Sequence, residues 1–330
     1  WAWSVEDALA LYGTYTMAVY FTPVIGGLLA DRYLGYRFAV ILGALAMTIG
    51  HASMAVETPL FLYIGIGFLM VGNGLFKPNM TSIISYAYEK HPEKKDGAYS
   101  LYYMGVNAGA FLGIMLCGYI GEKISWSWGF GLAGIFMFFG MLQFYFTQDI
   151  FGAIGLKPSA ESKQASKAKA AAENTPPNVV RDRIIAVLIF SVFTVFFWAA
   201  FEQAGGSMTI FAEKYTQREL IGTSASVFKI ADALLTIIPL LVITYVLIKL
   251  FKQTFKKYAT GNLILATSFV IIWGIVLWKV GREYGTTGTE VPATWFGILN
   301  SLFIVCFAPV FSKWWESRYN LSGPMKFGLG

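Results

Sequence analysis

The chain has 330 residues, of which 56% are hydrophobic and only 13% are charged. That charged share is about half of the roughly 25% found in soluble domains, and the mean hydropathy is +0.57. Too few polar side chains are present to cover a soluble fold, so most of the surface must face lipid. The net charge of +6 is spread over short loops rather than along one face, which argues against nucleic-acid binding.

Cysteine and histidine are scarce and scattered. The two cysteines, Cys117 and Cys306, lie within apolar runs, and the two histidines, His51 and His91, are far apart in the sequence. The sequence therefore predicts neither a disulfide framework nor a metal site, and no catalytic constellation of side chains.

Nine segments are long and apolar enough to cross a bilayer, which takes about 20 residues per helix. In chain order they are 8–30, 38–56, 60–86, 98–121, 126–148, 184–212, 225–248, 258–278 and 291–312. A tenth begins at Pro324, and the first starts almost at residue 1 without a preceding signal peptide. We therefore expect further helices beyond both ends of this sequence.

Lys and Arg are distributed unevenly over the loops between these segments. The loops near 31–37, 89–96, 149–183, 249–257 and 312–318 hold 17 of them, whereas 57–59, 121–125, 213–224 and 279–290 hold 5. Cytoplasmic loops carry an excess of Lys and Arg. The bias supports the predicted spans and places the first set of loops in the cytoplasm.

Residues 157–182 are rich in Ala, Lys, Ser and Pro and lack apolar periodicity, as is typical of a solvated linker. We predict an N-terminal bundle at 1–148, a cytoplasmic linker at 149–183 and a C-terminal bundle at 184–330, with an inserted transmembrane hairpin at 225–278. Two helical bundles joined by a basic linker are the architecture of major facilitator transporters. The predicted fold class is thus an all-α membrane protein with two six-helix bundles, incomplete at both ends, and an extra two-helix hairpin.

Two ionisable residues within predicted spans are candidate functional groups, because charge in the bilayer is costly and usually faces a cavity or a partner. Lys77 follows Gly72 and Gly74, which let a neighbouring backbone approach, and precedes Pro78, which removes a backbone donor. Glu202 lies far along its span and could exchange a proton in a medium of low dielectric constant. The alternative for each is a side chain that reaches the solvated end of its helix.

The other charges within or between the spans have a simpler interpretation. Lys229 and Asp232 are three residues apart on one helix, so we expect them to neutralise each other. Asp31 and Arg32, in the turn between the first two spans, can pair with helix ends or with each other.

Four motifs resemble those of a known family. The segment GGLLADRYLGYR resembles the G-x-x-x-D-R-x-x-G signature of major facilitators, and GNGLFKPN, YYMGVNAGAF and FWAAFEQAGGSM resemble three signatures of the proton-coupled oligopeptide transporters. They occur in the order of that family, whose members import di- and tripeptides together with protons.

The resemblance implies a central peptide site and a conformational role for Asp31 and Arg32. Lys77 and Glu202 would engage the two peptide termini and couple the proton. The implied substrate-binding residues are Tyr20, Lys77, Tyr103, Asn107, Trp198, Glu202 and Asn300. Three departures stand out: the family's E-x-x-E-R motif and its helix 10 glutamate are not in this sequence, and Ser301 follows Asn300 where the family has proline.

We therefore expect a proton-coupled symporter of di- and tripeptides that is not an enzyme and needs no cofactor beyond the proton gradient. It would act as a monomer in the cell membrane, with small peptides, protons and lipid as partners. The alternative is another proton-linked facilitator, for nitrate or drugs. An anion carrier would be expected to show paired arginines in its spans, and a membrane-embedded enzyme would need a catalytic constellation; neither is found.

Overall fold

A computed structural model describes residues 3–159, 176–316, 322, 324–325 and 328. Within these residues, nine helices are long and apolar enough to cross a membrane. This confirms the predicted all-α membrane fold class. Most residues of the tenth predicted span lie outside the described part of the chain. Two that are described, Pro324 and Met325, are helical.

The elements before the linker are mostly long helices joined by tight turns. They are α1 (Val5–Leu29), η1 (Ala30–Leu34), α2 (Tyr36–Met54), α3 (Pro59–Ala87), α4 (Pro92–Gly113), η2 (Ile114–Gly118), α5 (Tyr119–Lys123), α6 (Trp126–Thr147) and η3 (Gln148–Phe151).

The elements after the linker include a short two-stranded ribbon. They are α8 (Pro177–Phe201), η4 (Glu202–Ala204), α9 (Ser207–Tyr215), β1 (Glu219–Leu220), α10 (Gly222–Thr254), α11 (Ala259–Tyr284), β2 (Thr289–Glu290), η5 (Ala293–Gly297) and α12 (Ile298–Glu316). The strands β1 and β2 are antiparallel, with Glu219 opposite Glu290.

Several helices extend beyond their predicted spans, and two of these differences bear on the argument. Helix α8 begins at Pro177, so the last residues of the predicted linker are helical. Helix α11 continues to Tyr284. It therefore includes Lys279, which the sequence predicts in the loop 279–290, in the membrane-spanning segment. The reason for the second difference is an acidic partner for Lys279 on the neighbouring helix, described below.

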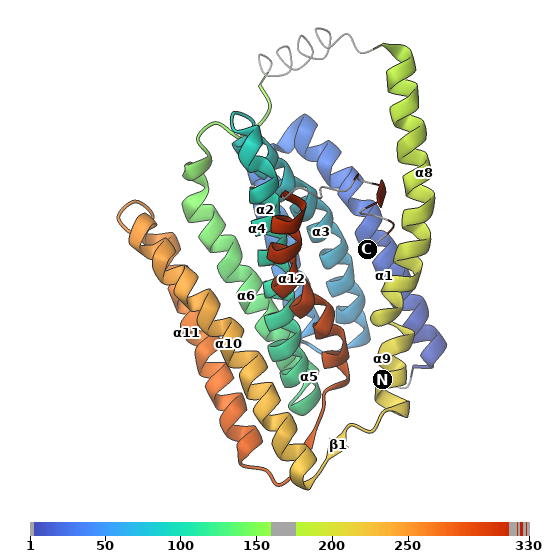
Figure 1. Ribbon diagram of the computed structural model, residues 1–330, viewed down its shortest axis with the longest axis vertical. Helices are drawn as coiled ribbons and strands as arrows, with labels where there is room; N and C mark the ends of the chain where they lie inside the picture. Colours follow the sequence, from blue (N-terminus) through green and yellow to red (C-terminus); the bar gives the residue numbers. More distant parts are fainter. Residues whose placement is uncertain (1–2, 160–175, 317–321, 323, 326–327, 329–330) are drawn as a thin grey trace.

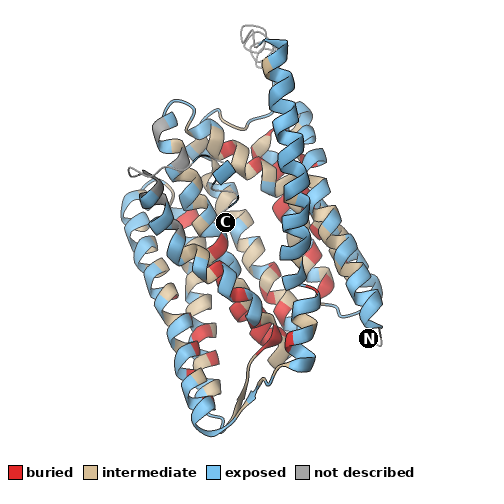
Figure 2. Cartoon of the chain, turned by 45° about the vertical axis from the view of Figure 1, so that its right-hand side comes forward, coloured by how far each residue is buried: buried red, intermediate tan, exposed pale blue. Residues whose placement is uncertain are grey.

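The hairpin α10–α11 lies alongside α6 at one side of the molecule, and α8 stands at the opposite side next to α1 (Figure 1). Helix α12 packs beside α4 between them. Figure 2 shows α8 exposed along almost its whole length, and none of its residues is buried. The hairpin, although it follows α8 and α9 in the sequence, therefore packs against helices that precede the linker.

Helices α2 and α3 approach each other through glycines. A Cβ on Gly43 would lie 2.7 Å from the carbonyl oxygen of Gly72, and a Cβ on Gly50 would lie 2.9 Å from that of Gly65. Small residues allow close approach of helix backbones where lipid supplies no hydrophobic drive for association. The predicted approach of backbone to the glycines before Lys77 is also present, since a Cβ on Gly74 would lie 2.8 Å from the oxygen of Thr22.

The main apolar core joins elements from both sides of the linker. It contains Met115 and Leu116 of η2, Tyr119 of α5, Leu240 of α10 and Val276 of α11. Trp295 of η5 and Ile298 of α12 also belong to it. The hairpin is thus part of the core rather than an appendage on it.

Candidate functional site

Four of the seven predicted substrate-binding residues come together between α1, α3 and α8. The Tyr20 hydroxyl donates to Glu202 Oε1 at 2.9 Å, and the Tyr20 and Trp198 rings are 5.1 Å apart. Lys77 Nζ lies 5.5 Å from the centre of the Tyr20 ring, within the range of a cation–π contact. Tyr20 thus contacts both a cation on α3 and a carboxylate at the end of α8.

Tyr12 is a member of this cluster that the sequence reasoning missed. Its hydroxyl donates to Glu202 Oε2 at 3.0 Å, so each oxygen of the carboxylate accepts from one tyrosine of α1. A Cβ on Gly205 would lie 2.2 Å from the Tyr12 hydroxyl, so only glycine allows this approach. A signal was present in the sequence, because Tyr12 and Tyr20 are eight residues apart and share a helix face.

Helix α4 carries Tyr103 and Asn107 one turn apart, as predicted. Asn107 is buried and its Nδ2 donates to the Tyr103 carbonyl at 2.9 Å, whereas the Tyr103 side chain is exposed. Within the described residues, neither side chain contacts the Tyr20 cluster through a hydrogen bond, ion pair or ring contact. The structure therefore does not bring this pair into contact with the cluster.

A cavity of about 760 Å³ connects Glu202 to the start of α12. Asn300, the seventh predicted residue, lines it together with Glu202 and Cys117. Small and aromatic residues supply most of the wall, among them Gly113, Gly129 and Phe130. Of its polar residues, His51 and Thr294 each have a buried side-chain atom (Nδ1 and Oγ1) without a hydrogen-bond partner among the residues that the structure describes.

Asp31 and Arg32, the predicted conformational pair, are both exposed on η1 and form no ion pair within the described residues. The buried member of this turn is Arg37, whose Nε donates to the Ile154 carbonyl at 2.5 Å. Arg37 Nη2 also donates to Gly152, and Arg37 N donates to Gly155 at 3.0 Å. Arg37 thereby fastens the start of the linker to the turn between α1 and α2.

The expected ion pair between Lys229 and Asp232 is wrong. Asp232 Oδ1 instead accepts from Lys279 Nζ of α11 at 2.5 Å, and their side chains are 3% and 0% exposed. Lys229 Nζ donates to the Thr286 carbonyl at 2.6 Å. The antiparallel hairpin brings Lys279 opposite Asp232. The long side chain of Lys229 instead reaches the end of the span, where the carbonyl oxygen of Thr286 is available.

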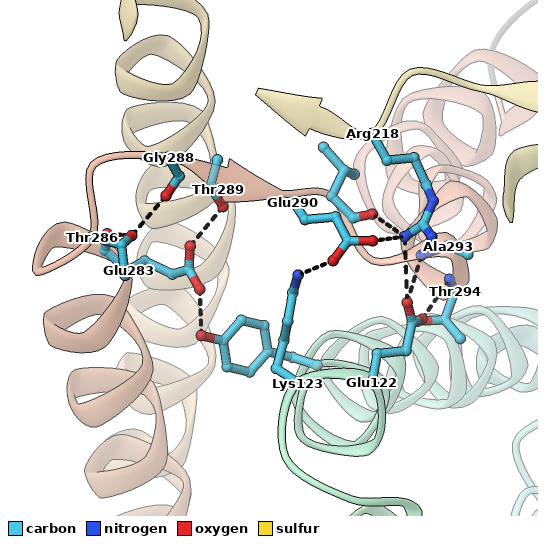
Figure 3. A network of polar contacts seen from close by, with 12 residues as sticks. Glu122, Lys123, Arg218, Glu283, Thr286, Gly288, Thr289, Glu290, Ala293 and Thr294 are labelled. Carbon is cyan, nitrogen blue, oxygen red and sulfur yellow. Dashed lines mark hydrogen bonds and ion pairs between the residues drawn. The ribbon is translucent and has the colours of Figure 1, made fainter. Parts of the chain in front are cut away.

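A second polar network lies at the end of the molecule where β1 and β2 meet α5 (Figure 3). Arg218 Nη1 lies 2.9 Å from Glu290 Oε1 and 3.8 Å from Glu122 Oε2, and Lys123 Nζ lies 2.7 Å from Glu290 Oε2. The hydrogen bond from Lys123 and the nearby positive charges lower the pKa of Glu290. Sequence reasoning did not find this network, because it depends on the contact between two loops and α5.

The chain is similar to known transporters. A model of the POT family matches residues 37–176. The peptide transporter YePEPT of Yersinia enterocolitica is 28% identical, over 98% of this chain and 63% of its own length. The di-/tripeptide transporter of Lactococcus lactis is 25% identical with the same coverage of both chains.

A solved structure agrees with these relatives. The crystal structure of a peptide transporter POT in complex with sulfate superposes with a TM-score of 0.52 at 27% identity, over 93% of this chain and 59% of that chain. The chain thus spans somewhat less than two thirds of the length of the relatives it matches. The four motifs, the helical fold and these matches agree in their similarity to the POT family.

Proposed function

We propose that this chain acts in the import of di- and tripeptides together with protons by alternating access. The observation that carries the proposal is the Tyr20 cluster, in which Lys77 and Glu202 both contact one tyrosine. A peptide is a zwitterion, so a site with one cation and one carboxylate offers a partner to each of its termini. The printed names of two relatives, a peptide transporter and a di-/tripeptide transporter, favour the same substrate class.

Proton coupling follows from the state of the Glu202 carboxylate. Two tyrosine hydroxyls donate to it at 2.9 and 3.0 Å, and both come from α1. A charged carboxylate accepts these bonds and attracts a peptide ammonium, whereas a protonated one loses that attraction. Proton binding at Glu202 would therefore alter both the contact between α1 and α8 and the affinity for peptide, which is the linkage that a symporter needs.

Varied side chains can be accepted because the walls beside the charged groups are adaptable. The Tyr20 and Trp198 rings supply an apolar surface without directed bonds. Tyr103, Asn107 and Asn300 would complete the site by contacts to the peptide backbone. Binding between helices from the two predicted bundles favours closure around the substrate.

The remaining parts of the proposal concern the setting. The protein would reside in the cell membrane as a multi-pass monomer, with the linker 149–183 in the cytoplasm according to the excess of Lys and Arg on that side. The end that carries Glu122 and Glu290 would then face outward. No cofactor takes part; the proton gradient supplies the energy, and the chain carries its substrate without catalysing a reaction.

The test is uptake of a labelled dipeptide into proteoliposomes with and without an imposed inward proton gradient. We expect accumulation only with the gradient, and competition by unlabelled di- and tripeptides but not by free amino acids. Uptake of nitrate and of drug substrates, measured in parallel vesicles, tests the alternative that the protein is a carrier for one of these. Gradient-driven uptake of one of these without any peptide uptake would overturn the proposal.

A further inference from the structure

The outer polar network contains one carboxylate that is bound by the backbone of the segment leading to α12. Glu122 Oε2 accepts from Ala293 N at 2.8 Å, and Glu122 Oε1 accepts from Thr294 N at 2.9 Å. These two amides open η5, and Figure 3 shows the carboxylate directed at them. Amides at the start of a helical turn lack partners within it, so a carboxylate there satisfies two donors at once.

The same segment forms one wall of the cavity beside Glu202. Thr294, Phe296 and Gly297 of η5 line the cavity, as does Asn300 in the first turn of α12. A Cβ on Gly118 would lie 2.6 Å from Thr294 Oγ1, so η5 lies directly against the α4–α5 side of the cavity. A displacement of η5 from α5 would therefore widen the cavity at its outer end.

The contact between Glu122 and η5 is of a kind that can separate at low cost. The Glu122 and Arg218 side chains are 17% and 15% exposed, and Glu290 is 41% exposed, so water reaches the network. Groups at such a rim exchange their partners for water when they part, whereas separation of charges in the dry interior leaves them unsolvated. Asp232 and Lys279, at 3% and 0% exposure, illustrate the second kind.

We propose that Glu122, neutralised by Arg218, is a gate residue that closes the outer end of the cavity by holding η5 against α5. Arg218 supports the closed state in two ways, since its Nη1 lies near Glu122 and also donates to the Val291 carbonyl at 2.9 Å, two residues before η5. This gate belongs to the transport cycle of the proposed function, and it is distinct from the Glu202 site. Its opening admits substrate from the outside.

Cys117 provides a direct measurement of this opening. It lines the cavity, and Cys306 is the second of the two cysteines of the chain. In a Cys306→Ser background, we would measure the labelling rate of Cys117 by a membrane-impermeant thiol reagent added outside. Glu122→Ala is expected to raise the rate about tenfold, a typical size for coupling between two conformational states. Glu122→Gln keeps an acceptor oxygen, so its labelling rate for Cys117 should lie between those of Glu122→Ala and the wild type.

Glu219→Gln is the matched control. Glu219 lies on β1 beside Arg218 and is exposed, and it forms no ion pair within the described part of the chain. Its substitution removes the same charge from the same ribbon and should leave the labelling rate unchanged. A folded Glu122→Ala variant that labels at the wild-type rate would refute the gate, as would an equal rise for Glu219→Gln.

A cross-link keeps the proposal testable if removal of Glu122 impairs folding. Glu122→Cys combined with Thr294→Cys, with both native cysteines replaced by serine, would be bridged by a short bifunctional thiol reagent with a cleavable disulfide. Uptake should be lost on bridging and recovered on reduction, whereas full uptake by the bridged protein would overturn the gate. If the wild type takes up no peptide but Glu122→Ala still accelerates labelling of Cys117, the proposed substrate is wrong and the gate stands.

Discussion

Removal of the charge on Asp232 should destabilise the protein more than removal of a charge in the hairpin that lies outside its pair with Lys279. Asp232→Asn keeps the size of the side chain but leaves Lys279 without its ionic partner at 2.5 Å. Lys279 is fully buried, and its Nζ lies 4.3 Å from the Trp295 ring centre and 5.4 Å from that of Tyr119. These rings and Thr236 are too weakly polar to replace a carboxylate.

The size of the effect follows from the geometry. At 2.5 Å the attraction between two unit charges amounts to about 7 kcal/mol at an effective dielectric constant of 20. Much of this offsets the cost of removing both ions from water, and the loss of one partner of such a pair costs about 3–5 kcal/mol. At about 2 °C per kcal/mol for a chain of this size, the midpoint of thermal unfolding should fall by about 6–10 °C.

The assay is thermal unfolding of the purified protein in one detergent, arranged as a double-mutant cycle of Asp232→Asn and Lys279→Met. The double variant should recover most of the loss, because it leaves no unpaired charge in the interior. Lys229→Met is the control on the same helix. Its ammonium bonds a carbonyl oxygen at the end of the span, so its removal should cost less and should add independently to Asp232→Asn.

The cycle decides between the two possible partners of Asp232. A coupling energy between Asp232 and Lys279 below about 0.5 kcal/mol, the usual error of additivity, would refute the buried pair. Strong coupling between Lys229 and Asp232 would restore the pairing that the sequence suggests.

Three further outcomes are expected. Lys77→Ala should abolish gradient-driven dipeptide uptake. The variant should still fold, because Lys77 forms no ion pair within the described residues. Accumulation at the wild-type level would exclude Lys77 from the site. Glu202→Gln should keep some peptide exchange, weaken peptide binding by about 1–3 kcal/mol and lose accumulation, so unimpaired driven uptake would remove Glu202 from the coupling. The pKa of Glu290 is lowered from 4.5, so its ionic contribution is complete above that pH and is lost as the pH falls through the lowered value. The difference in thermal stability between wild type and Glu290→Gln should therefore be constant from pH 7 to 5 and vanish only in stronger acid.

Composition and hydropathy were sufficient to predict the spans, because the need for about 20 apolar residues per crossing is imposed by the bilayer and not by the partners of a helix. The same reasoning selected Lys77 and Glu202 from their cost in lipid, and the structure brings both to Tyr20. That the side chains meet there was expected from the family resemblance rather than from spacing. Their roles in binding and coupling remain predictions.

The partners of Lys229, Asp232 and Arg37 were not predicted for one reason. Spacing along the sequence identifies neighbours on the same helix but not partners on other elements. The spacing of three residues predicts an ion pair between Lys229 and Asp232. However, Asp232 and Lys279 lie at similar distances along the sequence from the turn between α10 and α11. In an antiparallel hairpin such positions face each other, so this signal was available. Arg37 offers no such signal, because its acceptors are carbonyl oxygens of Gly152 and Ile154 that depend on the local turn.

The two ionic networks of the hairpin region have opposite physical characters, and this difference suggests how the region divides its tasks. The Asp232–Lys279 pair lies in the interior beside Met115, Tyr119 and Trp295, where its separation would leave both charges without solvent. The network of Glu122, Arg218 and Glu290 is reached by water and can part and reform. A hairpin fixed in the core by the first network gives the second a stable base. Motion at η5 can then be confined to this exposed rim, while the apolar core beside it stays packed.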